Sequence, residues 1–337
     1  YKKGSFAFVL KANSYGLGAK VIAKELENYD KIEYIAVATL NEAIHIKDTT
    51  RKPIWILGYL RDDLLLEAIK HNFAITLSDI NQIQLIKEKT ISFINVDTGF
   101  HRYGIKPDSV LIENLKQNPN IILNGIYTHL KLSDKHNDII QVNKLKQLNI
   151  NLPISISDSI AYIRHNFEEE SLYRIGALLY GLTQKRDENI LQVMPVFSLK
   201  TSINRIEELD EDTTIGYSDK LYPEHTRIAT IPIGYADGLN RDMKDAYVTI
   251  NQQQAPYIGI LSMDHAMIDI TGLDVSLYDE VVILGQNGIS VEALSYKLKT
   301  NKNEILSKLS SRIPRIYTKE NIPVILYDEL GGVYYED

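Results

Sequence analysis

The stretch Phe6-Ala7-Phe8-Val9-Leu10-Lys11 decides how the rest of the chain is read. Its apolar residues predict a buried strand, and Lys11 stands at the carboxyl end of that strand. Partial burial of an amine at such a point lowers its pKa from about 10.4 and frees a nucleophile. Two interpretations stay open here. The lysine either extends to the surface or forms a Schiff base, for which pyridoxal phosphate (PLP) is the commonest partner.

The residues that follow this strand alternate short β-rich runs with helical patterns as far as about residue 180. Apolar residues spaced three and four apart recur between the runs, as at Leu64, Leu65, Ala68 and Ile69. Strands that alternate with helices favour an α/β fold, and eight of them predict a (β/α)8 TIM-type barrel. The expected strands are 6–10, 34–38, 54–57, 74–77, 92–96, 125–129, 153–157 and 173–180.

Polar side chains collect where these expected strands end. In a (β/α)8 barrel the carboxyl ends of the strands carry the functional residues, because all eight open on one face. We therefore expect a site at that face. Its candidate residues are Lys11, Asp97, His129, Asp158, Ser159 and Arg174.

The pattern changes near Met194-Pro195, where alternating, strand-like runs replace the helical spacing. Turn signals such as Ala236-Asp237-Gly238 separate these runs. The sequence thus predicts a barrel over 1–194 and a mostly β domain over 195–337. The expected strands are 196–206, 227–233, 246–250, 256–261, 267–270 and 280–284, followed by a helical stretch over 291–309 and a last strand over 324–327.

Composition excludes several classes of protein. The chain has 337 residues, of which 44% are hydrophobic and 24% charged, and its net charge of −7 argues against a nucleic-acid binder. It contains no cysteine, which excludes disulfides and thiolate metal sites. No metal-ligand spacing stands out, and no apolar run approaches the roughly 18 residues that span a bilayer.

Seven motifs occur in one order along the chain, and together they resemble the alanine racemase family of fold-type III PLP enzymes. The resemblance runs from about residue 4 to residue 327. Each motif is weak alone, whereas seven in order across both predicted domains are specific. They read KANSYG (11–16), DTGFHRYG (97–104), YTH (127–129), RIGALLYG (174–181), GYADG (234–238), SMD (262–264) and RIPR (312–315).

The resemblance implies a two-base mechanism. Lys11 is expected to bind PLP as a Schiff base and to act as one acid/base group, with Tyr217 as the other. Two bases on opposite faces of the α-carbon can remove a proton and return one without rotating the intermediate. His129 and Arg174 resemble the residues that make the phenol a usable base, and Arg174 also pairs with the pyridine nitrogen.

The remaining expected ligands also follow from the resemblance. Those for the cofactor, beyond Lys11 and Arg174, are Tyr15, Ser159, Gly176, Ala177 and Tyr235. Those for the substrate are Arg102, Met263 and Asn303. In this family the tyrosine base enters from the partner's β domain, so the resemblance implies a head-to-tail homodimer.

Three departures from the family pattern stand out. Asn95 replaces a lysine, carbamylated in some relatives, beside Arg102, and Asp158 stands where an asparagine is usual. We expect Asp158 or a bound anion to supply the missing counter-charge, with neutral drift as the alternative. Asn303 replaces a tyrosine that narrows the alanine pocket, and its amide adds a donor and an acceptor that suit a serine hydroxyl.

Asn303 also occurs in the membrane-anchored serine racemases of vancomycin (glycopeptide) resistance. The sequence therefore predicts a serine/alanine racemase that supplies D-serine for altered cell-wall precursors. We further expect an N-terminal transmembrane domain before Tyr1, which would make this chain a cytoplasmic domain of a membrane protein. A biosynthetic alanine racemase is the alternative. A fold-type III decarboxylase, which normally uses a cysteine, and a non-enzymatic PLP sensor are weaker rivals.

Overall fold

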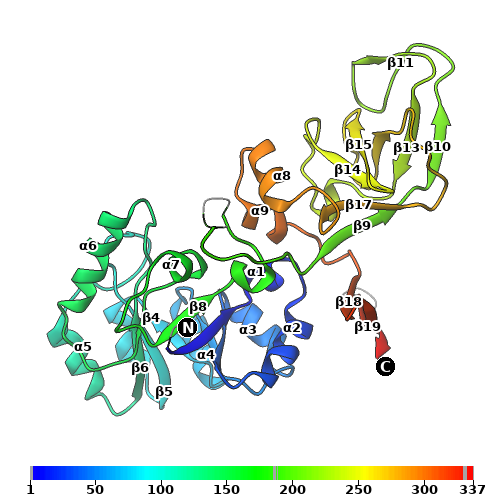
Figure 1. Cartoon of the computed structure of the whole chain (residues 1–337). Helices are drawn as coiled ribbons and strands as arrows, with labels where there is room; N and C mark the ends of the chain where they lie inside the picture. The colour runs from blue at the N-terminus through cyan, green and yellow to red at the C-terminus, as the bar shows by residue number, and fades with distance from the viewer. Residues whose placement is uncertain (1–2, 185–186, 188, 329–331, 337) are drawn as a thin grey trace. The chain divides into compact units, whose positions relative to one another are not determined.

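The computed structural model describes residues 3–184, 187, 189–328 and 332–336 (Figure 1). The chain forms two compact units. The first comprises Tyr1–Ser14 and Gly18–Val193, and the second comprises Tyr15–Leu17 and Met194–Asp337. The sequence predicts the division after residue 194. It does not indicate that Tyr15–Leu17, close to Lys11 in the sequence, belong to the second unit.

Parallel strands build the first unit. They form two four-stranded sheets in the orders β3-β2-β1-β8 and β4-β5-β6-β7. Parallel bridges join the two sheets at Trp55 and Ala74 and again at Ile154 and Glu170, so the eight strands close into the predicted barrel. The strands are β1 (Ser5–Val9), β2 (Ile32–Val37), β3 (Ile54–Ile56), β4 (Ile75–Leu77), β5 (Thr90–Asn95), β6 (Ile121–Tyr127), β7 (Ile154–Ser155) and β8 (Leu172–Ile175).

Helices connect the strands, and acidic or hydroxyl side chains start several of them. The side chains of Thr39, Asp108, Asp134 and Asp158 each accept backbone N–H groups in the first turn that follows. These caps fix where the chain leaves each loop. The helices are α1 (Lys11–Tyr15), α2 (Ala19–Glu25), η1 (Leu26–Asn28), α3 (Leu40–Ile46), α4 (Asp62–Lys70), η2 (Ile80–Leu85), α5 (Ser109–Lys116), α6 (Lys135–Lys146), α7 (Ser159–Arg164) and η3 (Ala177–Tyr180).

Alternate residues of the strands fill the barrel interior. Val9, Tyr127 and Leu172 belong to one buried cluster inside the barrel, where the ring of Trp55 stacks on that of Phe93 at 4.0 Å between centroids. The intervening strand residues, such as Ile35 and Ile94, pack in a second cluster with the helices. A period of two residues therefore assigns each strand position to the barrel interior or to the helical layer.

The last strand of the barrel is shorter than the sequence predicts. The expected strand over 173–180 ends at Ile175, and 177–180 form the 3-10 helix η3. Gly176, with φ −121° and ψ −91°, turns the chain out of the sheet, and Gly181 ends η3 in the left-handed region with φ 73°. Apolar content misled the prediction here, because a short run of this kind fits a strand or a buried helical turn equally well.

The second unit is mostly antiparallel β structure, as predicted. Its main sheet has the order β10-β13-β16-β15-β14-β17-β9, and β11 pairs with β12 apart from it. The elements up to residue 285 are β9 (Ser198–Ser202), β10 (Arg205–Glu208), β11 (Thr213–Thr214), β12 (Leu221–Tyr222), β13 (Arg227–Ile231), η5 (Tyr235–Asp237), β14 (Tyr247–Ile250), β15 (Gln253–Ile258), β16 (Ala266–Asp269) and β17 (Glu280–Gly285).

Three expectations for this unit are wrong in detail. The run 196–206 is two strands, β9 and β10, rather than one. The helical stretch 291–309 is two helices, α8 (Val291–Lys297) and α9 (Lys302–Ser307), because Lys299 adopts φ 51° and Asn301 then caps α9. The single strand expected over 324–327 belongs to a three-stranded sheet of β18 (Arg315–Lys319), β19 (Ile322–Asp328) and β20 (Gly332–Glu336).

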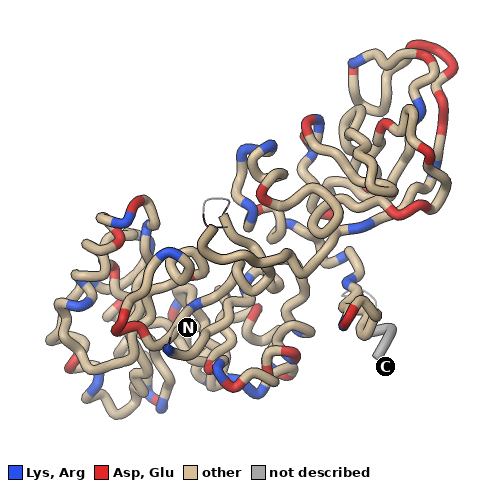
Figure 2. Tube along the Cα trace, in the orientation of Figure 1, with Lys and Arg blue, Asp and Glu red and all other residues tan. Residues whose placement is uncertain are grey.

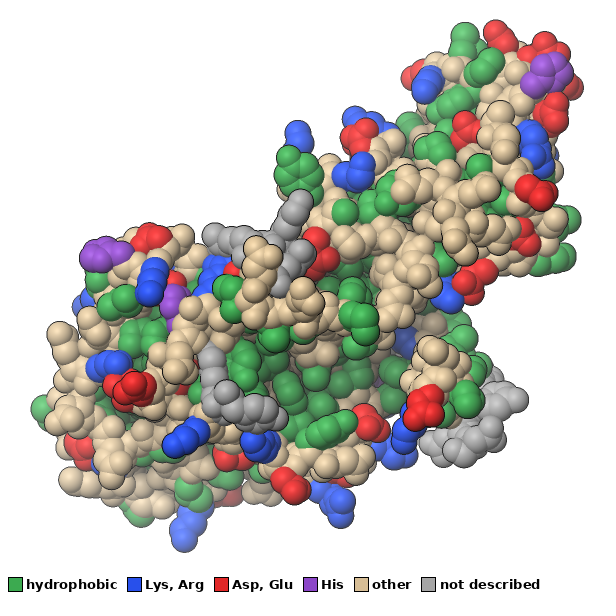
Figure 3. Space-filling view, viewed as in Figure 1, with side chains coloured by type: hydrophobic (Ala, Val, Ile, Leu, Met, Phe, Trp, Pro, Cys, Tyr) green, Lys and Arg blue, Asp and Glu red, His purple; other side chains and the backbone are tan. Residues whose placement is uncertain are grey.

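Charge is mixed along both units, with one local exception. Acidic side chains gather around β10 and the loop that leads to β11 in the second unit (Figures 2 and 3), where residues 207–212 contain five carboxylates. A surface of this sign repels phosphate backbones. None of the helices in the described part of the chain has the length and apolar character needed to cross a bilayer.

Candidate active site

The carboxyl end of the barrel brings together seven predicted site residues. Lys11, His129 and Arg174 each stand two positions after an inward-facing residue, namely Val9, Tyr127 and Leu172. Because side chains alternate along a strand, these three share the interior face of the barrel. The seven residues are Lys11, Arg102, His129, Ser159, Arg174, Gly176 and Ala177.

A left-handed turn follows Lys11 directly. Ala12, Asn13, Ser14 and Tyr15 all have φ between 51° and 58°. The left-handed region costs a non-glycine residue about 1–2 kcal/mol, so a turn of four such residues must be held by its surroundings. The sequence did not predict this turn, because no glycine stands among the four residues.

Hydrogen bonds hold the turn at both ends. The amide of Ala12 donates to Oε1 of Glu42 at 2.7 Å, and the amide of Ser14 donates to the carbonyl of Leu10 at 2.8 Å. The Ser14 hydroxyl, fully buried, pairs with the Tyr180 hydroxyl of η3. Glu42 of α3 and Tyr180 of η3 therefore fix the direction in which the chain leaves Lys11.

The surroundings of Lys11 favour its neutral amine. Burial lowers the pKa of the amine from 10.5, and the positive charge of Arg102 lowers it further. The carboxylates of Glu42 and Asp158 act in the opposite direction, and the net effect is a lowered pKa. Solvent still reaches the side chain, so the amine is both accessible and easier to deprotonate than a surface lysine.

Arg174 is a buried cation held by neutral groups. Its side chain is 5% exposed, and it donates to the Ser155 hydroxyl at 2.5 Å and to the Thr128 carbonyl at 2.6 Å. Its guanidinium also lies over the Tyr127 ring, 4.8 Å from the centroid. Within the described residues no acidic group forms an ion pair with it. A buried guanidinium held by neutral groups keeps its charge available to an external acceptor.

His129 is held neutral at ordinary pH. Burial lowers the pKa of its ring to about 4; the charge of Asp158 works against that shift, and those of Arg174, Arg102 and Lys11 add to it. The ring packs edge-on against Phe100, with centroids 4.7 Å apart. A neutral imidazole can accept a proton or a hydrogen bond, which an imidazolium at this place cannot do.

The Ser159 hydroxyl accepts hydrogen bonds from two backbone amides that follow β8. It accepts N–H groups from Gly176 at 3.0 Å and from Leu178 at 3.2 Å, on either side of Ala177. Ser159 is also the first residue of α7. The Ser159 O–H remains a donor, and the amide of Ala177 lies between the two that Ser159 accepts; this hydroxyl and amide suit a phosphate group.

A folded-back loop carries Arg102 beside the barrel mouth. The Asp97 carboxylate accepts amides from Gly99 at 2.9 Å and His101 at 3.1 Å, and it also contacts the His101 ring. Burial works to raise the pKa of Asp97, but these hydrogen bonds outweigh it and the pKa is lowered. Arg102 lies over the Phe100 ring at 4.6 Å.

Asn95 and Asp158, two of the departures from the family pattern, form hydrogen bonds with groups other than Arg102. The Asp158 carboxylate caps α7, accepting the amides of Ile160 and Ala161 at 2.9 Å each. In the described part of the chain it forms no ion pair with Arg102. Asn95 donates to the Ser78 hydroxyl at 3.5 Å. A bound anion beside Arg102 therefore stays a prediction, and the Asp158 pairing has no support in the geometry.

Five predicted site residues lie in the second unit. Tyr15 is buried and begins the segment Tyr15–Leu17. Within this unit Arg315 donates to the Gly16 carbonyl at 2.9 Å, and the Tyr317 hydroxyl donates to the Leu17 carbonyl at 2.8 Å. Gly16 cannot be replaced easily, because a Cβ there would lie 2.2 Å from the Leu306 carbonyl oxygen.

Tyr235 and Met263 stand side by side in two adjoining loops. The Tyr235 amide donates to the Ser262 carbonyl at 3.2 Å, and the Ala236 amide donates to the Met263 carbonyl at 3.0 Å. Both side chains are exposed, Tyr235 by 41% and Met263 by 54%. The loops can therefore present them together to a ligand or to a second chain.

One arginine connects the two loops. Arg312 donates from Nε to Oδ1 of Asp237 at 2.7 Å and from Nη2 to Oδ1 of Asp264 at 2.6 Å. Asp237 in turn accepts the Gly234 amide at 2.8 Å. The sequence offered Arg312 only as part of a motif and gave it no role; in the structure its side chain adds to the backbone hydrogen bonds that join the loops of Tyr235 and Met263.

Tyr217 lies in the loop between β11 and β12 and is 71% exposed. It follows Gly216, whose φ of 57° requires a glycine-like conformation and whose Cβ would lie 2.7 Å from Met267 Cε. An aromatic side chain exposed to this extent has no packing role in its own unit, so it is free to reach a neighbouring molecule.

Asn303 is the second residue of α9, and its amide donates to Asn301 Oδ1 at 2.8 Å. Its side-chain oxygen is buried and accepts no hydrogen bond from the described residues. A buried acceptor without a donor is costly, and such groups frequently mark a place where a ligand or water completes the bonding.

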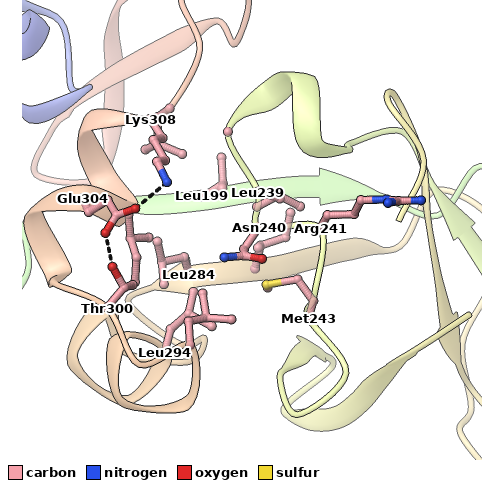
Figure 4. A pocket seen from close by; sticks show the side chains of 15 residues that line it. Leu199, Leu239, Asn240, Arg241, Met243, Leu284, Leu294, Thr300, Glu304 and Lys308 are labelled. Atoms are coloured by element: carbon pink, nitrogen blue, oxygen red, sulfur yellow. Dashed lines mark hydrogen bonds and ion pairs between the residues drawn. The ribbon is translucent and has the colours of Figure 1, made fainter. Parts of the chain in front are cut away.

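The second unit also contains a cavity of about 280 Å³ (Figure 4). Leucines such as Leu199, Leu239 and Leu284 line it, and the polar groups at one side pair with each other, Glu304 with Lys308 and with Thr300. None of the predicted site residues is among the residues that line it.

The donors present fit pyridoxal phosphate. Ser159 with the adjoining amides suits the phosphate, Lys11 offers an amine of lowered pKa, and Arg174 is a buried cation with no ion pair to an acidic group among the residues that the structure describes. Two further residues of this arrangement were missed from the sequence, Glu42 and Tyr180. Glu42 does carry a signal, since Thr39-x-x-Glu42 reads as a capping box.

Comparison with known proteins identifies the family. The family model "Alanine racemase, N-terminal domain" matches residues 2–184, and "Alanine racemase, C-terminal domain" matches residues 196–317. The alanine racemase of Methanococcus maripaludis is 33% identical over 345 residues, covering 94% of this chain and 92% of the relative. Alanine racemase 2 of Caldanaerobacter subterraneus is 33% identical over 338 residues, covering 92% of this chain and 87% of the relative.

Solved structures agree with this match. The alanine racemase of Clostridium difficile 630 superposes with a TM-score of 0.91 at 28% identity, covering 97% of this chain and 92% of that one. The alanine racemase of Bartonella henselae, described with covalently bound pyridoxal phosphate, gives 0.80 at 25% identity, covering 94% and 93%. Since both family models match in order and several relatives align over nearly the full length, the chain belongs to the alanine racemase family.

Proposed function

We propose that this chain interconverts L-alanine and D-alanine. As a member of the alanine racemase family, it is a PLP-dependent isomerase. The observation that carries the proposal is the group at the barrel mouth, where Lys11, of lowered pKa, shares a face with neutral His129 and the buried cation Arg174. The sequence predicts serine as the main substrate and alanine as the alternative. The relatives and solved structures named above are alanine racemases, and they favour alanine.

The residues divide the work of binding and proton transfer. When bound, PLP supplies an electron-withdrawing ring that makes the proton on the substrate α-carbon acidic. Ser159 and the amides near Gly176 would hold its phosphate, and Arg174 would face its ring nitrogen without giving up a proton. Lys11 would hold its aldehyde carbon and exchange a proton at Nζ with one face of the α-carbon.

The second proton position requires a group on the opposite face. Tyr217 is the candidate, and its 71% exposure supports a role toward a second copy of the chain. Met263 and Tyr235, exposed in adjoining loops of the same unit, would reach the same neighbouring site. A head-to-tail homodimer, in which each chain completes the other's site, is part of the proposal.

Serine is a second candidate substrate, and Asn303 favours it. Its buried side-chain oxygen has no donor among the described residues, and a substrate hydroxyl could supply one. Sites with buried hydrogen-bonding groups distinguish a hydroxyl from a methyl group far better than apolar pockets do. The proposed role in glycopeptide resistance depends on this second activity. Membrane anchoring and a cytoplasmic location stay predictions from the sequence.

Chiral chromatography of the products tests both parts. The purified protein with PLP is incubated with L-alanine or L-serine, with Lys11→Ala as the inactive variant and Lys87→Ala as an exposed-lysine control. We expect D-alanine from the wild type and from Lys87→Ala. Serine turnover comparable to alanine turnover would support the second candidate, and negligible serine turnover would remove it. No D-product from either substrate, despite uptake of PLP, would overturn the proposal.

A further inference from the structure

We propose that Glu42 is a positioning residue for Lys11, acting through the backbone amide of Ala12. The inference rests on the proposed role of Lys11 as the cofactor lysine. Glu42 belongs to α3, a different βα unit of the barrel from the strand that ends at Lys11. Its carboxylate therefore joins the end of β1 to the beginning of α3.

Both oxygens of the Glu42 carboxylate accept backbone amides. Oε1 accepts the Ala12 amide at 2.7 Å, while Oε2 accepts the Ala38 amide at 2.7 Å and the Thr39 amide at 3.1 Å. Only the last of these contacts belongs to an ordinary capping box. The contact with Ala12 reaches across to another strand, and helix capping alone does not account for it.

The contact with Ala12 matters because of the conformation that begins there. Ala12 is the first of four left-handed non-glycine residues, and its φ and ψ are 53° and 51°. A charged acceptor for its amide stabilises that conformation against a return to extended or right-handed backbone. If the turn relaxed, Leu10 and Lys11 would no longer be fixed in direction at the barrel mouth.

Glu42 also acts on the amine itself. The charged groups that face Lys11 are Arg102 from the loop after β5, Glu42 from α3 and Asp158 from the start of α7, with His129 after β6. Arg102 favours the neutral amine, and the two carboxylates favour the ammonium. Removal of the Glu42 charge should therefore make Lys11 lose its proton at lower pH.

The test uses the protein without PLP, so that it does not depend on catalysis. Glu42→Gln keeps the size of the side chain and removes its charge, and Glu42→Asp keeps the charge and shortens the reach. Thr39→Ala is the matched control, since the Thr39 hydroxyl caps the same helix by accepting the Glu42 amide at 3.3 Å. It weakens the start of α3 without touching Ala12.

Two measurements separate positioning from general destabilisation. For Glu42→Gln we expect the Ala12 amide to exchange with solvent about tenfold to a hundredfold faster than in the wild type. We also expect trace labelling of Lys11 with acetic anhydride to reach half its maximum at lower pH. Glu42→Asp should accelerate exchange at Ala12 with little change in that midpoint, and Thr39→Ala should change neither.

Unchanged exchange at Ala12 and an unchanged labelling midpoint in Glu42→Gln would overturn the inference. Should that variant fail to fold, unchanged exchange in Glu42→Asp would overturn it equally. The proposed function fails differently, through PLP uptake at a lysine other than Lys11 or through the absence of racemisation. The exchange and labelling results stand apart from both, because neither uses the cofactor.

Discussion

Arg312 Nε lies 2.7 Å from Oδ1 of Asp237, and the other arm of the same guanidinium reaches Asp264 at 2.6 Å. The two carboxylates belong to different loops, which carry Tyr235 and Met263. A planar fork with donors in fixed directions can hold both loops at one spacing. Together with the backbone hydrogen bonds from Tyr235 and Ala236 to the Met263 loop, this side chain sets the spacing of the loops.

We therefore expect Arg312→Lys to change substrate binding more than turnover. An ammonium lacks the fork, so the Met263 loop loses one of the contacts that fix its distance from Tyr235. The KM for alanine should rise about tenfold while kcat changes by less than about threefold. Because the Arg312 side chain is 39% exposed, the free energy of unfolding should change little.

Steady-state kinetics and urea unfolding of the same preparations check this prediction. Arg205→Lys is the control, since Arg205 is an exposed arginine of the same unit that pairs with Glu207. A fall in kcat with an unchanged KM would show that the loops act on the reaction itself rather than on binding.

Asn303→Tyr should lower serine turnover more than alanine turnover. On the proposed role of Asn303, the phenol ring would narrow the substrate pocket, and the change removes the buried amide oxygen that a serine hydroxyl could satisfy. We expect the ratio of kcat/KM for serine to that for alanine to fall about tenfold or more. The two substrates are assayed in parallel. An equal loss of kcat/KM for both would mean that Asn303 does not distinguish the serine hydroxyl.

His129 should weaken the protein in mild acid. Burial holds its pKa near 4, whereas an unfolded histidine takes up a proton near pH 6.5. Between these values the unfolded state binds more protons, so the stability that depends on neutral His129 is intact above about pH 6.5 and falls as the pH drops toward 4.

His129→Gln should therefore lose less stability than the wild type between pH 6.5 and pH 4. The midpoint of urea unfolding measured across this range provides the comparison. His136→Gln, at an exposed position on α6, is the control. If the wild type and His129→Gln follow parallel curves, the histidine ring is not the group that titrates.

The paired hydroxyls of Ser14 and Tyr180 should be energetically coupled. Both side chains are buried, and removal of one hydroxyl leaves the other without this partner. We expect Ser14→Ala and Tyr180→Phe each to lower the free energy of unfolding by about 1–2 kcal/mol. The double variant should cost less than the sum, and a double-mutant cycle of urea unfolding measures the difference. Strictly additive losses would mean that the two hydroxyls act independently.

The repetitive parts of the fold could be predicted from the sequence, and most of the strands were. The barrel strands are apolar on both faces, so their composition marks them, and the helices between them show regular spacing. Lys11 was found in the same way, as a charge at the end of an apolar run. Tyr217 and Met263 had no such signal and entered only through a family resemblance.

The errors occur where local conformation depends on distant contacts. Ala12 and Ser14 look like ordinary helix or strand residues, and only Glu42 and Tyr180 explain why the backbone turns left-handed there. The break between α8 and α9 is similar, since Lys299 carries no composition signal for φ 51°. The role of Arg312 could not be predicted, because the two carboxylates that it binds, those of Asp237 and Asp264, lie far from it and from each other in the sequence.

The pairing of β1 with β8 also has a consequence for how the molecule is made. Ala7 lies in register with Arg174, so the first strand of the barrel finds its second neighbour only in the last one. During synthesis the ribosome releases β1 long before β8 exists, and one edge of β1 stays open in the nascent chain. Closure of that seam places β8, which carries Arg174, beside β1, whose carboxyl end leads to Lys11. A chain whose synthesis stopped before β8 would thus have an unpaired strand edge, which favours aggregation, and no cofactor pocket. Closure of the barrel both covers this edge and completes the pocket.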